Sequence, residues 1–148
     1  MTVKNLLKNI LPIFMLLLFS SCKTNRIKNN ERHGKWIDTF STPKVTYKTV
    51  GRFKDGFEKG THKRFANKKL HRKEKYKNGI CHTTYYYPNG TVMSQGNTKL
   101  SVTDEELHWY YQGDWKFYDE NGKLLGIKSY EQGQLVNQVE TESEVLSN

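Results

Sequence analysis

The chain has 148 residues, of which 35% are hydrophobic, 13% aromatic and 26% charged. This length allows one domain of ordinary size. The hydrophobic fraction lies below the roughly 45–50% of globular proteins, which excludes a thick buried core. The aromatic content argues against disorder, because disordered chains are poor in Trp, Tyr and Phe. A formal net charge of +9 leaves a nucleic-acid partner open at this point.

The first 21 residues have the layout of a secretory signal. Lys4 and Lys8 precede an apolar run at residues 10–19, and two serines follow it. A cationic start, an apolar stretch of about 7–15 residues and a small-residue exit are typical of such signals. The run is shorter than the roughly 20 residues that a spanning helix requires. We therefore predict a signal peptide at residues 1–21 and an exported protein.

Cys22 follows the two serines directly. Small residues before a cysteine at the end of an apolar run resemble the lipobox of bacterial lipoproteins, although Phe19 stands where that motif usually has Leu. The resemblance implies cleavage before Cys22 and its lipidation, which would anchor the chain to a membrane. Lys23 replaces the acidic residue that retains some lipoproteins in the inner membrane, so we predict the outer membrane. Ordinary cleavage that leaves a free Cys22 thiol is the alternative.

Two segments flank the part of the chain that we expect to fold. Residues 22–32 are polar and show no periodicity, which predicts a flexible tether. Residues 135–148 contain Glu140, Glu142 and Glu144 and no aromatic residue, which predicts an acidic disordered tail. The folded domain is therefore expected at residues 33–134.

A pattern recurs within this domain. Gly-x-Trp occurs at residues 34–36 and 113–115, and Gly-x-His stands in the same place at 60–62. Each unit closes with an aromatic residue, two further residues and a glycine, and the closing Gly56 and Gly79 are 23 residues apart. Repeats of this length predict a modular fold. The pattern predicts four units, at residues 33–56, 57–79, 80–112 and 113–133, with an insertion in the third unit near residues 100–108.

Each unit is expected to form a β-hairpin. Asn89-Gly90 and Asn121-Gly122 are strong hairpin signals, because both residues of such a turn must tolerate positive φ. Asn78-Gly79 would turn the chain from one unit into the next. The prediction is an all-β fold in which repeated hairpins form an elongated, single-layer antiparallel meander.

The run at residues 113–124, the turn at 87–90 and the closure at 76–79 resemble MORN-variant repeats. In bacteria this group includes the YwqK-type proteins, which are named as antitoxins or immunity proteins. The resemblance covers about residues 33–134 and implies one twisted sheet with aromatic rings stacked from unit to unit. It also implies, as an alternative function, neutralisation of a cognate toxin. A classical antitoxin acts in the cytoplasm, whereas this chain carries an export signal.

No motif predicts catalysis. The five histidines form no pair at metal-ligand spacing, and the chain has no P-loop and no Gly-x-Ser-x-Gly. Asp38, Asp55 and Glu58 are scattered rather than paired. Cys81 and His82 should face opposite sides of a strand, so Cys81 is expected to be a buried or edge thiol. We predict a protein that is not an enzyme, with no metal site, no catalytic residue and no cofactor.

Two groups of residues are candidates for binding. Trp109, Tyr111 and Trp115 belong to the densest aromatic cluster, which would serve either as a platform for sugars or proteins or as the thin core of the sheet. The second group comes from the basic stretch at residues 59–77 and comprises Lys63, Arg64, Lys69 and Lys73. Alternate members of this stretch would share one face as a positive stripe, or they would simply be solvated.

The charge is unevenly distributed, which bears on the partner. Residues 23–90 contain 18 basic and 5 acidic residues, whereas residues 91–148 contain 4 basic and 10 acidic ones. For an exported protein, nucleic acid is the wrong partner, and anionic lipid or an acidic protein fits better. We predict a cell-envelope lipoprotein that acts as a non-catalytic interaction module, with a protein partner. Binding of an envelope glycan or anionic lipid is a further alternative.

Overall fold

The computed structural model describes residues 24–102 and 106–141; the predicted signal peptide and Cys22 lie outside them. The described residues form ten strands and no helix. The strands are β1 (Arg26–Lys28), β2 (Glu31–Ser41), β3 (Thr46–Lys54), β4 (Phe57–Ala66), β5 (Lys69–Lys77), β6 (Ile80–Tyr86), β7 (Val92–Val102), β8 (Leu107–Tyr118), β9 (Leu124–Glu131) and β10 (Gln134–Glu140).

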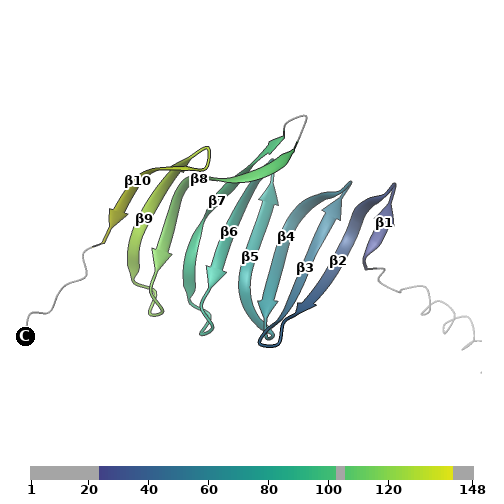
Figure 1. The fold of residues 1–148 in the computed structure, drawn as a ribbon, viewed down its shortest axis with the longest axis horizontal. Helices are drawn as coiled ribbons and strands as arrows, with labels where there is room; N and C mark the ends of the chain where they lie inside the picture. The colour runs from purple at the N-terminus through teal and green to yellow at the C-terminus, as the bar shows by residue number, and fades with distance from the viewer. Residues whose placement is uncertain (1–23, 103–105, 142–148) are drawn as a thin grey trace, which may run out of the picture.

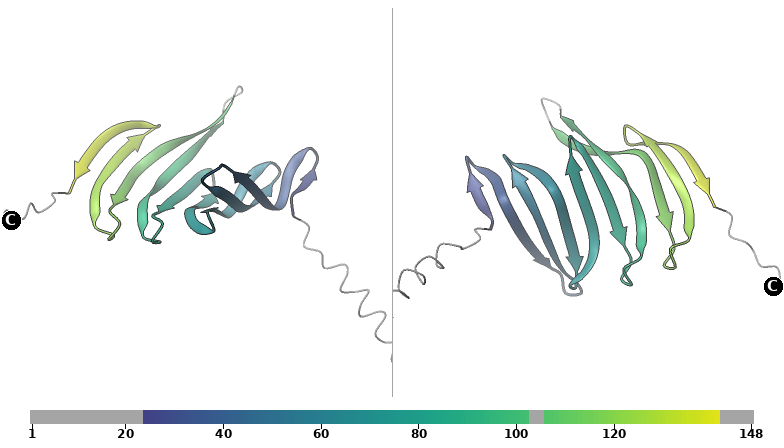
Figure 2. Two further views of the ribbon diagram at one scale, coloured as in Figure 1. Left: turned by 60° about the horizontal axis from the view of Figure 1, so that its bottom comes forward. Right: turned by 180° about the vertical axis from the view of Figure 1, so that it is seen from behind.

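The strands form one open sheet in which each strand pairs with its neighbours in the sequence, in the order β1 to β10. The strand pairs are antiparallel. Figure 1 shows the resulting elongated single layer, with β1 and β10 at opposite ends, and Figure 2 shows its twist from two further sides. The predicted single-layer meander of hairpins is confirmed.

The turns explain why the chain reverses where it does. Asp55-Gly56, Asn78-Gly79 and Gln132-Gly133 each have positive φ at both residues, which matches the twist of the strands they connect. The turns at residues 87–91 and 119–123 differ from the expectation, because only Gly90 and Gly122 have positive φ there. These turns are longer, and side chains stabilise them: the Asp119 carboxylate accepts hydrogen bonds from the amides of residues 121 and 123, at 2.9 and 2.8 Å.

The sheet extends beyond the predicted domain at both ends. Part of the segment expected to be a flexible tether forms β1, because Asn29 and Asn30 adopt the same two-residue turn that closes the later units. Part of the segment expected to be a disordered tail forms β10, which pairs with β9 after the turn at 132–133. Both extra strands are exposed along their length. Because exposed strands need no buried aromatic residues, their sequences look like those of unstructured segments.

The insertion near residues 100–108 lengthens two strands. Residues 100–102 belong to β7 and residues 107–108 to β8, so the hairpin projects past the turns beside it (Figures 1 and 2). We call residues 99–102 and 107–110 the arm. The arm brings Trp109 of β8 to Tyr76 of β5, with ring centroids 5.6 Å apart, although β6 and β7 separate these strands in the sheet. The arm therefore bends over one face.

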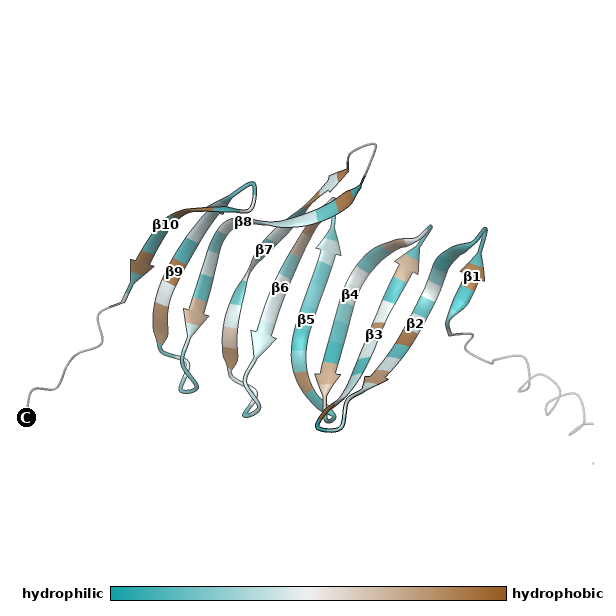
Figure 3. Ribbon diagram, in the orientation of Figure 1, coloured by the Kyte–Doolittle hydropathy of each residue, from teal (hydrophilic) through white to brown (hydrophobic). Residues whose placement is uncertain are grey.

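Burial is sparse, as the composition predicts. Among the described residues the buried apolar side chains are Cys81 and Trp115, with exposed fractions of 2% and 3%, and His62 follows at 4%. Figure 3 shows apolar positions scattered along the strands rather than gathered in a layer. A single-layer sheet has no second layer to pack against, so contacts between neighbouring repeats stabilise it.

Candidate functional site

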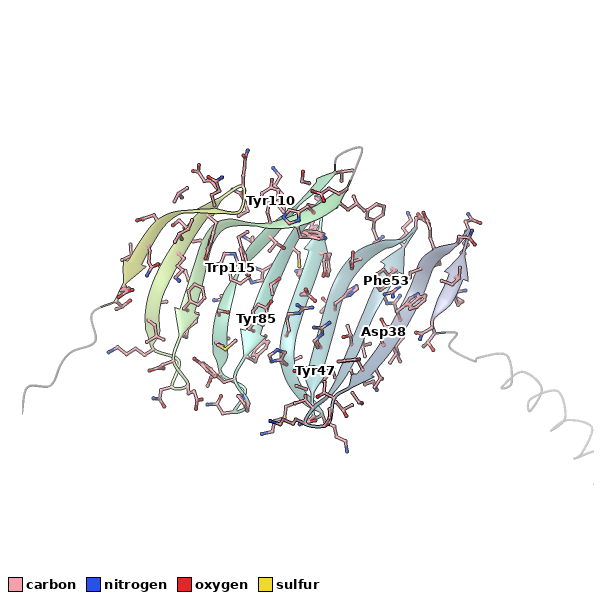
Figure 4. All side chains as sticks on the ribbon, in the orientation of Figure 1. Asp38, Tyr47, Phe53, Tyr85, Tyr110 and Trp115 are labelled. Carbon is pink, nitrogen blue, oxygen red and sulfur yellow. The ribbon has the colours of Figure 1, made fainter. Side chains whose placement is uncertain are left out.

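The register of the strands divides the side chains between two faces, because paired residues share a face and successive residues alternate. One face, here called the ring face, carries most of the aromatic rings, and Figure 4 labels four of them on β3, β6 and β8. Its ring residues include Trp36, Tyr47, Phe53, His62, Tyr76, Tyr85, Tyr111, Trp115 and Tyr130. The opposite face is called the back face.

The rings of the ring face contact one another in two rows, with neighbouring centroids 4.7–6.5 Å apart. The first row comprises Trp36, Phe53, His62, Tyr76 and Trp109. The second comprises Tyr47, His71, Tyr85, Trp115, Tyr111 and Tyr130. These neighbours are either edge-to-face or tilted pairs, and the edge-to-face geometry, which is the commoner one here, is favourable for aromatic rings. The rows explain how a thin sheet keeps its shape.

The recurring Gly-x-Trp pattern places a ring over a glycine of the preceding strand. A side chain on Gly96 would come within 2.4 Å of the Trp115 ring, and one on Gly51 within 2.3 Å of the His62 ring. The Trp115 indole N–H donates to the carbonyl of Asn97 at 2.9 Å. His62 Nε2 lies 2.8 Å from the carbonyl oxygen of Arg52, in the equivalent position. His62 is therefore a packing residue, which replaces Trp in the repeat.

The local backbone makes this placement possible. Gly60 and Gly113, which begin the two patterns, both have φ of 68°, and the pairing with the preceding strand is interrupted beside each of them. Gly34, which begins the first pattern, also has positive φ, at 79°. However, the short strand β1 pairs only with residues 31–33 of β2, so none of its residues is paired with Trp36. Its indole nitrogen is buried without a hydrogen-bond partner. The repeat is thus complete in its second and fourth units and incomplete at its N-terminal end.

Charged groups lie among the rings near the middle of the ring face. Arg72 and Glu74 form an ion pair of 3.3 Å, and the Glu74 side chain is only 12% exposed. Burial and the nearby carboxylates of Glu74 and Glu58, together with Cys81, raise the pKa of the Tyr76 hydroxyl. Burial likewise raises the pKa of the Cys81 thiol. Tyrosine and cysteine here are held in their neutral forms.

Cys81 and His82 face opposite sides, as predicted. The Cys81 sulfur lies on the ring face, 3.4 Å from the hydroxyl of Thr83. His82 is exposed on the back face, where its Nδ1 lies 3.0 Å from the side-chain oxygen of Asn97. The two residues therefore form no nucleophile–base pair.

A groove runs beneath the arm on the ring face. Its volume is about 460 Å³, and its floor and roof include Tyr76, Tyr85, Trp109, Tyr111 and Trp115. Glu58, Arg72 and Glu74 also line it. A second hollow of about 410 Å³ lies on the other side of the Tyr76–Trp109 ring pair. All three aromatic candidates from the sequence thus meet at one groove, although Trp115 is buried in its floor.

The back face of β3 to β5 is basic. The register places eight Lys and Arg residues there, all exposed, and we call this set the basic cluster: Lys48, Arg52, Lys54, Lys59, Lys63, Lys73, Lys75 and Lys77. The acidic residues of β3 to β5, Glu58 and Glu74, lie on the ring face instead. No ion pair among the described residues involves the cluster.

The structure divides the four basic candidates between the two faces. Lys63 and Lys73 are directly paired on the back face, whereas Arg64 and Lys69 lie on the ring face. An extra residue in β5, His71, shifts the alternation and so separates Lys69 from Lys73. Sequence reasoning also missed Arg72, Glu74 and Tyr76 as groove residues, because nothing in the linear pattern brings β5 under the arm.

The described residues hold no group of three or more His, Cys, Asp and Glu side chains that could bind a metal ion. In the same part of the chain, no helix has the length and apolar character needed to cross a membrane. The features that remain as candidate sites are the groove and the basic cluster.

Comparison with protein families identifies the repeat. Residues 82–100 and 111–132 match the family described as MORN repeat variant. The chain is similar to MORN-variant repeats over these two segments. The matched segments correspond to β6–β7 and to β8–β9, and the hairpins of β2 to β5 continue the same meander outside them. No curated protein and no solved structure matched the chain. MORN-variant repeats suggest a non-catalytic interaction module.

Proposed function

We propose that this protein is an exported, lipid-anchored, non-catalytic binding module whose basic cluster lies against an anionic membrane surface. The observation that carries the proposal is the pairing of like charges on the back face. Lys63 stands directly opposite Lys73, and Arg52 directly opposite Lys59. Like charges opposite each other destabilise a sheet, so their presence calls for a partner that compensates them.

The cations of the two faces differ in whether an acidic residue lies near them, and this difference supports a binding role for the cluster. On the ring face, Arg64 stands opposite Arg72, but Glu74 forms an ion pair with Arg72. On the back face, no acidic residue of β3 to β5 is present to form such an ion pair. A merely solvated surface mixes both signs of charge. An exposed face of a single sign attracts a surface of the opposite sign.

An anionic lipid surface fits the chemistry of this face. Each Lys or Arg near such a surface contributes about 1 kcal/mol, so a cluster of them binds firmly at low salt. A hollow of about 1010 Å³ opens beside the cluster, with Val50 and Phe65 in its lining together with Lys48 and Lys68. Apolar side chains next to lysines suit a headgroup and the first methylenes of its acyl chains.

Flotation with vesicles tests the role of the cluster. The chain from residue 23 lacks the predicted anchor and keeps every described residue, so its binding reports on the sheet alone. We expect binding to vesicles of one third phosphatidylglycerol and two thirds phosphatidylcholine, lost at high salt. Lys63→Ala with Lys73→Ala should weaken it about 30-fold, from about 1 kcal/mol per lysine.

A matched control removes the same charge from the other face. Lys69→Ala with Lys128→Ala should leave vesicle binding within about threefold of the parent chain, because both lysines lie on the ring face. Equal loss in both double variants would mean that net charge alone drives binding. No binding to the anionic vesicles would contradict the proposal.

The anchor is tested separately, on the full chain in its cells. We expect radiolabelled palmitate to be incorporated into the parent chain and not into Cys22→Ala. Cys81→Ala is the matched control, since its thiol is buried and should not affect labelling. Labelling of the Cys22→Ala chain at the parent level would contradict the anchor.

The antitoxin alternative makes a different prediction. An immunity protein binds one toxin tightly, so pull-down from detergent-solubilised membranes should recover a single toxin-like protein in stoichiometric amount. Recovery of structural envelope proteins, or of lipid alone, would favour the binding module that we propose.

A further inference from the structure

We infer that the groove beneath the arm is a binding site for a neutral glycan segment. The groove itself lies on the ring face and shares no residue with the basic cluster on the back face, whereas Lys59 and Lys77 of the cluster line the hollow beside it. It therefore adds a second ligand to the proposed membrane-bound module. The two proposals fail independently, because each is tested with variants of a different face.

The shape of the groove suits a chain of sugar rings. The groove and the adjoining hollow have volumes of about 460 and 410 Å³, within the range of about 300–1,000 Å³ for ligand sites. The rings of Tyr76 and Trp109 stand between the groove and the hollow, and both residues line both spaces. Both spaces open to solvent, and Glu58 lines both as well, so one extended ligand can occupy the two together.

The accessible rings offer apolar surfaces with polar tips. Tyr111 is 44% exposed, and Trp109 and Tyr76 are half-buried at the groove. The apolar C–H face of a sugar ring stacks on such a surface while its hydroxyls reach the neighbouring polar groups. Trp115 is too deeply buried for contact and instead supports Tyr111, with ring centroids 4.7 Å apart.

The charges of the groove select against ionic ligands. An anion would meet the carboxylates of Glu58 and Glu74, and a cation would meet the guanidinium of Arg72. A neutral polyhydroxyl ligand uses all three groups, because carboxylates accept hydrogen bonds from hydroxyls and a guanidinium donates to them. The Arg72 side chain is 23% exposed, so its guanidinium can donate to a ligand in the groove.

One of these charges also contacts a ring, since the Arg72 guanidinium lies 5.9 Å from the centroid of the Tyr85 ring. Burial of a charged group is unfavourable, and Glu74 is largely buried although the fully exposed back face lies on the other side of the same strand. Arg72 and Glu74 pair with each other, whereas Glu58 takes part in no ion pair among the described residues, so a polar ligand in the groove would give Glu58 a partner.

Titration calorimetry with defined oligosaccharides tests the inference. The full chain, with any lipid that it carries, is used in a detergent without a sugar headgroup, so that the detergent does not occupy the groove. The probes are the neutral hexasaccharides of glucose and of N-acetylglucosamine. We expect saturable binding of at least one of them, and we expect Trp109→Ala to weaken it about tenfold or more, as for other buried aromatic contacts.

Two further variants separate binding from folding. Glu58→Gln keeps the size of the side chain and removes its charge, and should weaken binding severalfold without changing the circular dichroism. Trp36→Ala removes a ring from the distant end of the same row, outside the groove, and should leave the affinity unchanged. Lys63→Ala with Lys73→Ala should also leave it unchanged.

Several results would overturn the inference. One is the absence of saturable binding by either hexasaccharide. Another is unchanged affinity in both Trp109→Ala and Glu58→Gln. Tighter binding of tetramethylammonium, or of a sulfated oligosaccharide, than of the neutral probes would assign the groove to an ion instead. Failure of vesicle binding would not bear on the groove, since those variants lie on the back face.

Discussion

The two faces of this sheet are built from the same ten strands yet differ in almost every physical property. The ring face carries the buried side chains Cys81, His62 and Trp115, rings in contact, and charges with partners. The back face of β3 to β5 carries exposed cations that oppose one another. An ordinary sheet buries one face against a second layer. Here the rings bury one another, and the remaining face is free to bind.

This difference separates stability from interaction. Side chains on the ring face should govern unfolding, because they make most of the tertiary contacts. Side chains on the back face should govern binding and should affect unfolding little or in the opposite direction. Four variants, one of them double, test this separation, and their expected effects decrease in the order given.

The largest effect is expected for Trp115→Ala. The indole is 3% exposed and is wedged over Gly96, so its removal should lower the free energy of unfolding by about 3–5 kcal/mol. Lys116→Ala, the next residue on the opposite face, is the matched control and should change it by less than about 0.5 kcal/mol. Urea denaturation followed by circular dichroism measures both. Similar values for the two would mean that the ring face does not dominate stability.

Gly96→Ala tests the ring-over-glycine contact from the other side. A Cβ at residue 96 would lie 2.4 Å from the Trp115 ring, so one of the two must move. Overpacking of this kind costs about 1–3 kcal/mol. In the Trp115→Ala background the same change should cost little, because the clash is gone. Strictly additive values in this double-mutant cycle would contradict the contact.

The Lys63→Ala and Lys73→Ala pair should act in the opposite direction. Removal of two like charges from opposite positions should raise the free energy of unfolding by about 0.2–1 kcal/mol. Thermal unfolding at low ionic strength checks this, and the gain should shrink as salt screens the charges. Destabilisation by the double variant would show that the lysine stems support the fold.

The smallest effect concerns His71, which lies between the rings of Tyr47 and Tyr85. Burial, and then Arg72 and Arg64, lower its pKa from the ordinary value of 6.5. The folded state therefore favours the neutral ring. The contribution to stability is fully present above pH 6.5 and is lost as the pH falls toward the lower pKa of the folded state. His71→Gln should flatten this part of the stability–pH curve, and an unchanged curve would contradict the assignment.

How much could be foreseen differs between the fold and the site. The hairpins and their order follow from the glycine and asparagine turns, although Asn89-Gly90 and Asn121-Gly122 form longer turns in which the glycine alone has positive φ. β1 and β10 could not be recognised, because both strands are exposed and lack the aromatic alternation of the other units. The groove was only half visible: Trp109 and Tyr111 stood out by composition, whereas Glu74 and Tyr76 lie more than thirty residues earlier in the chain.

By itself, the sequence determined the repeat, the antiparallel meander and the thin core, because turn chemistry and alternation act between neighbouring residues. Tertiary structure decided which face each side chain occupies. The extra residue at His71 moves Lys69 to the face opposite Lys73, and the bend of the arm carries Trp109 across two strands to Tyr76. Bulges and bends depend on how strands pair and twist together, so the spacing of residues along the sequence does not predict them.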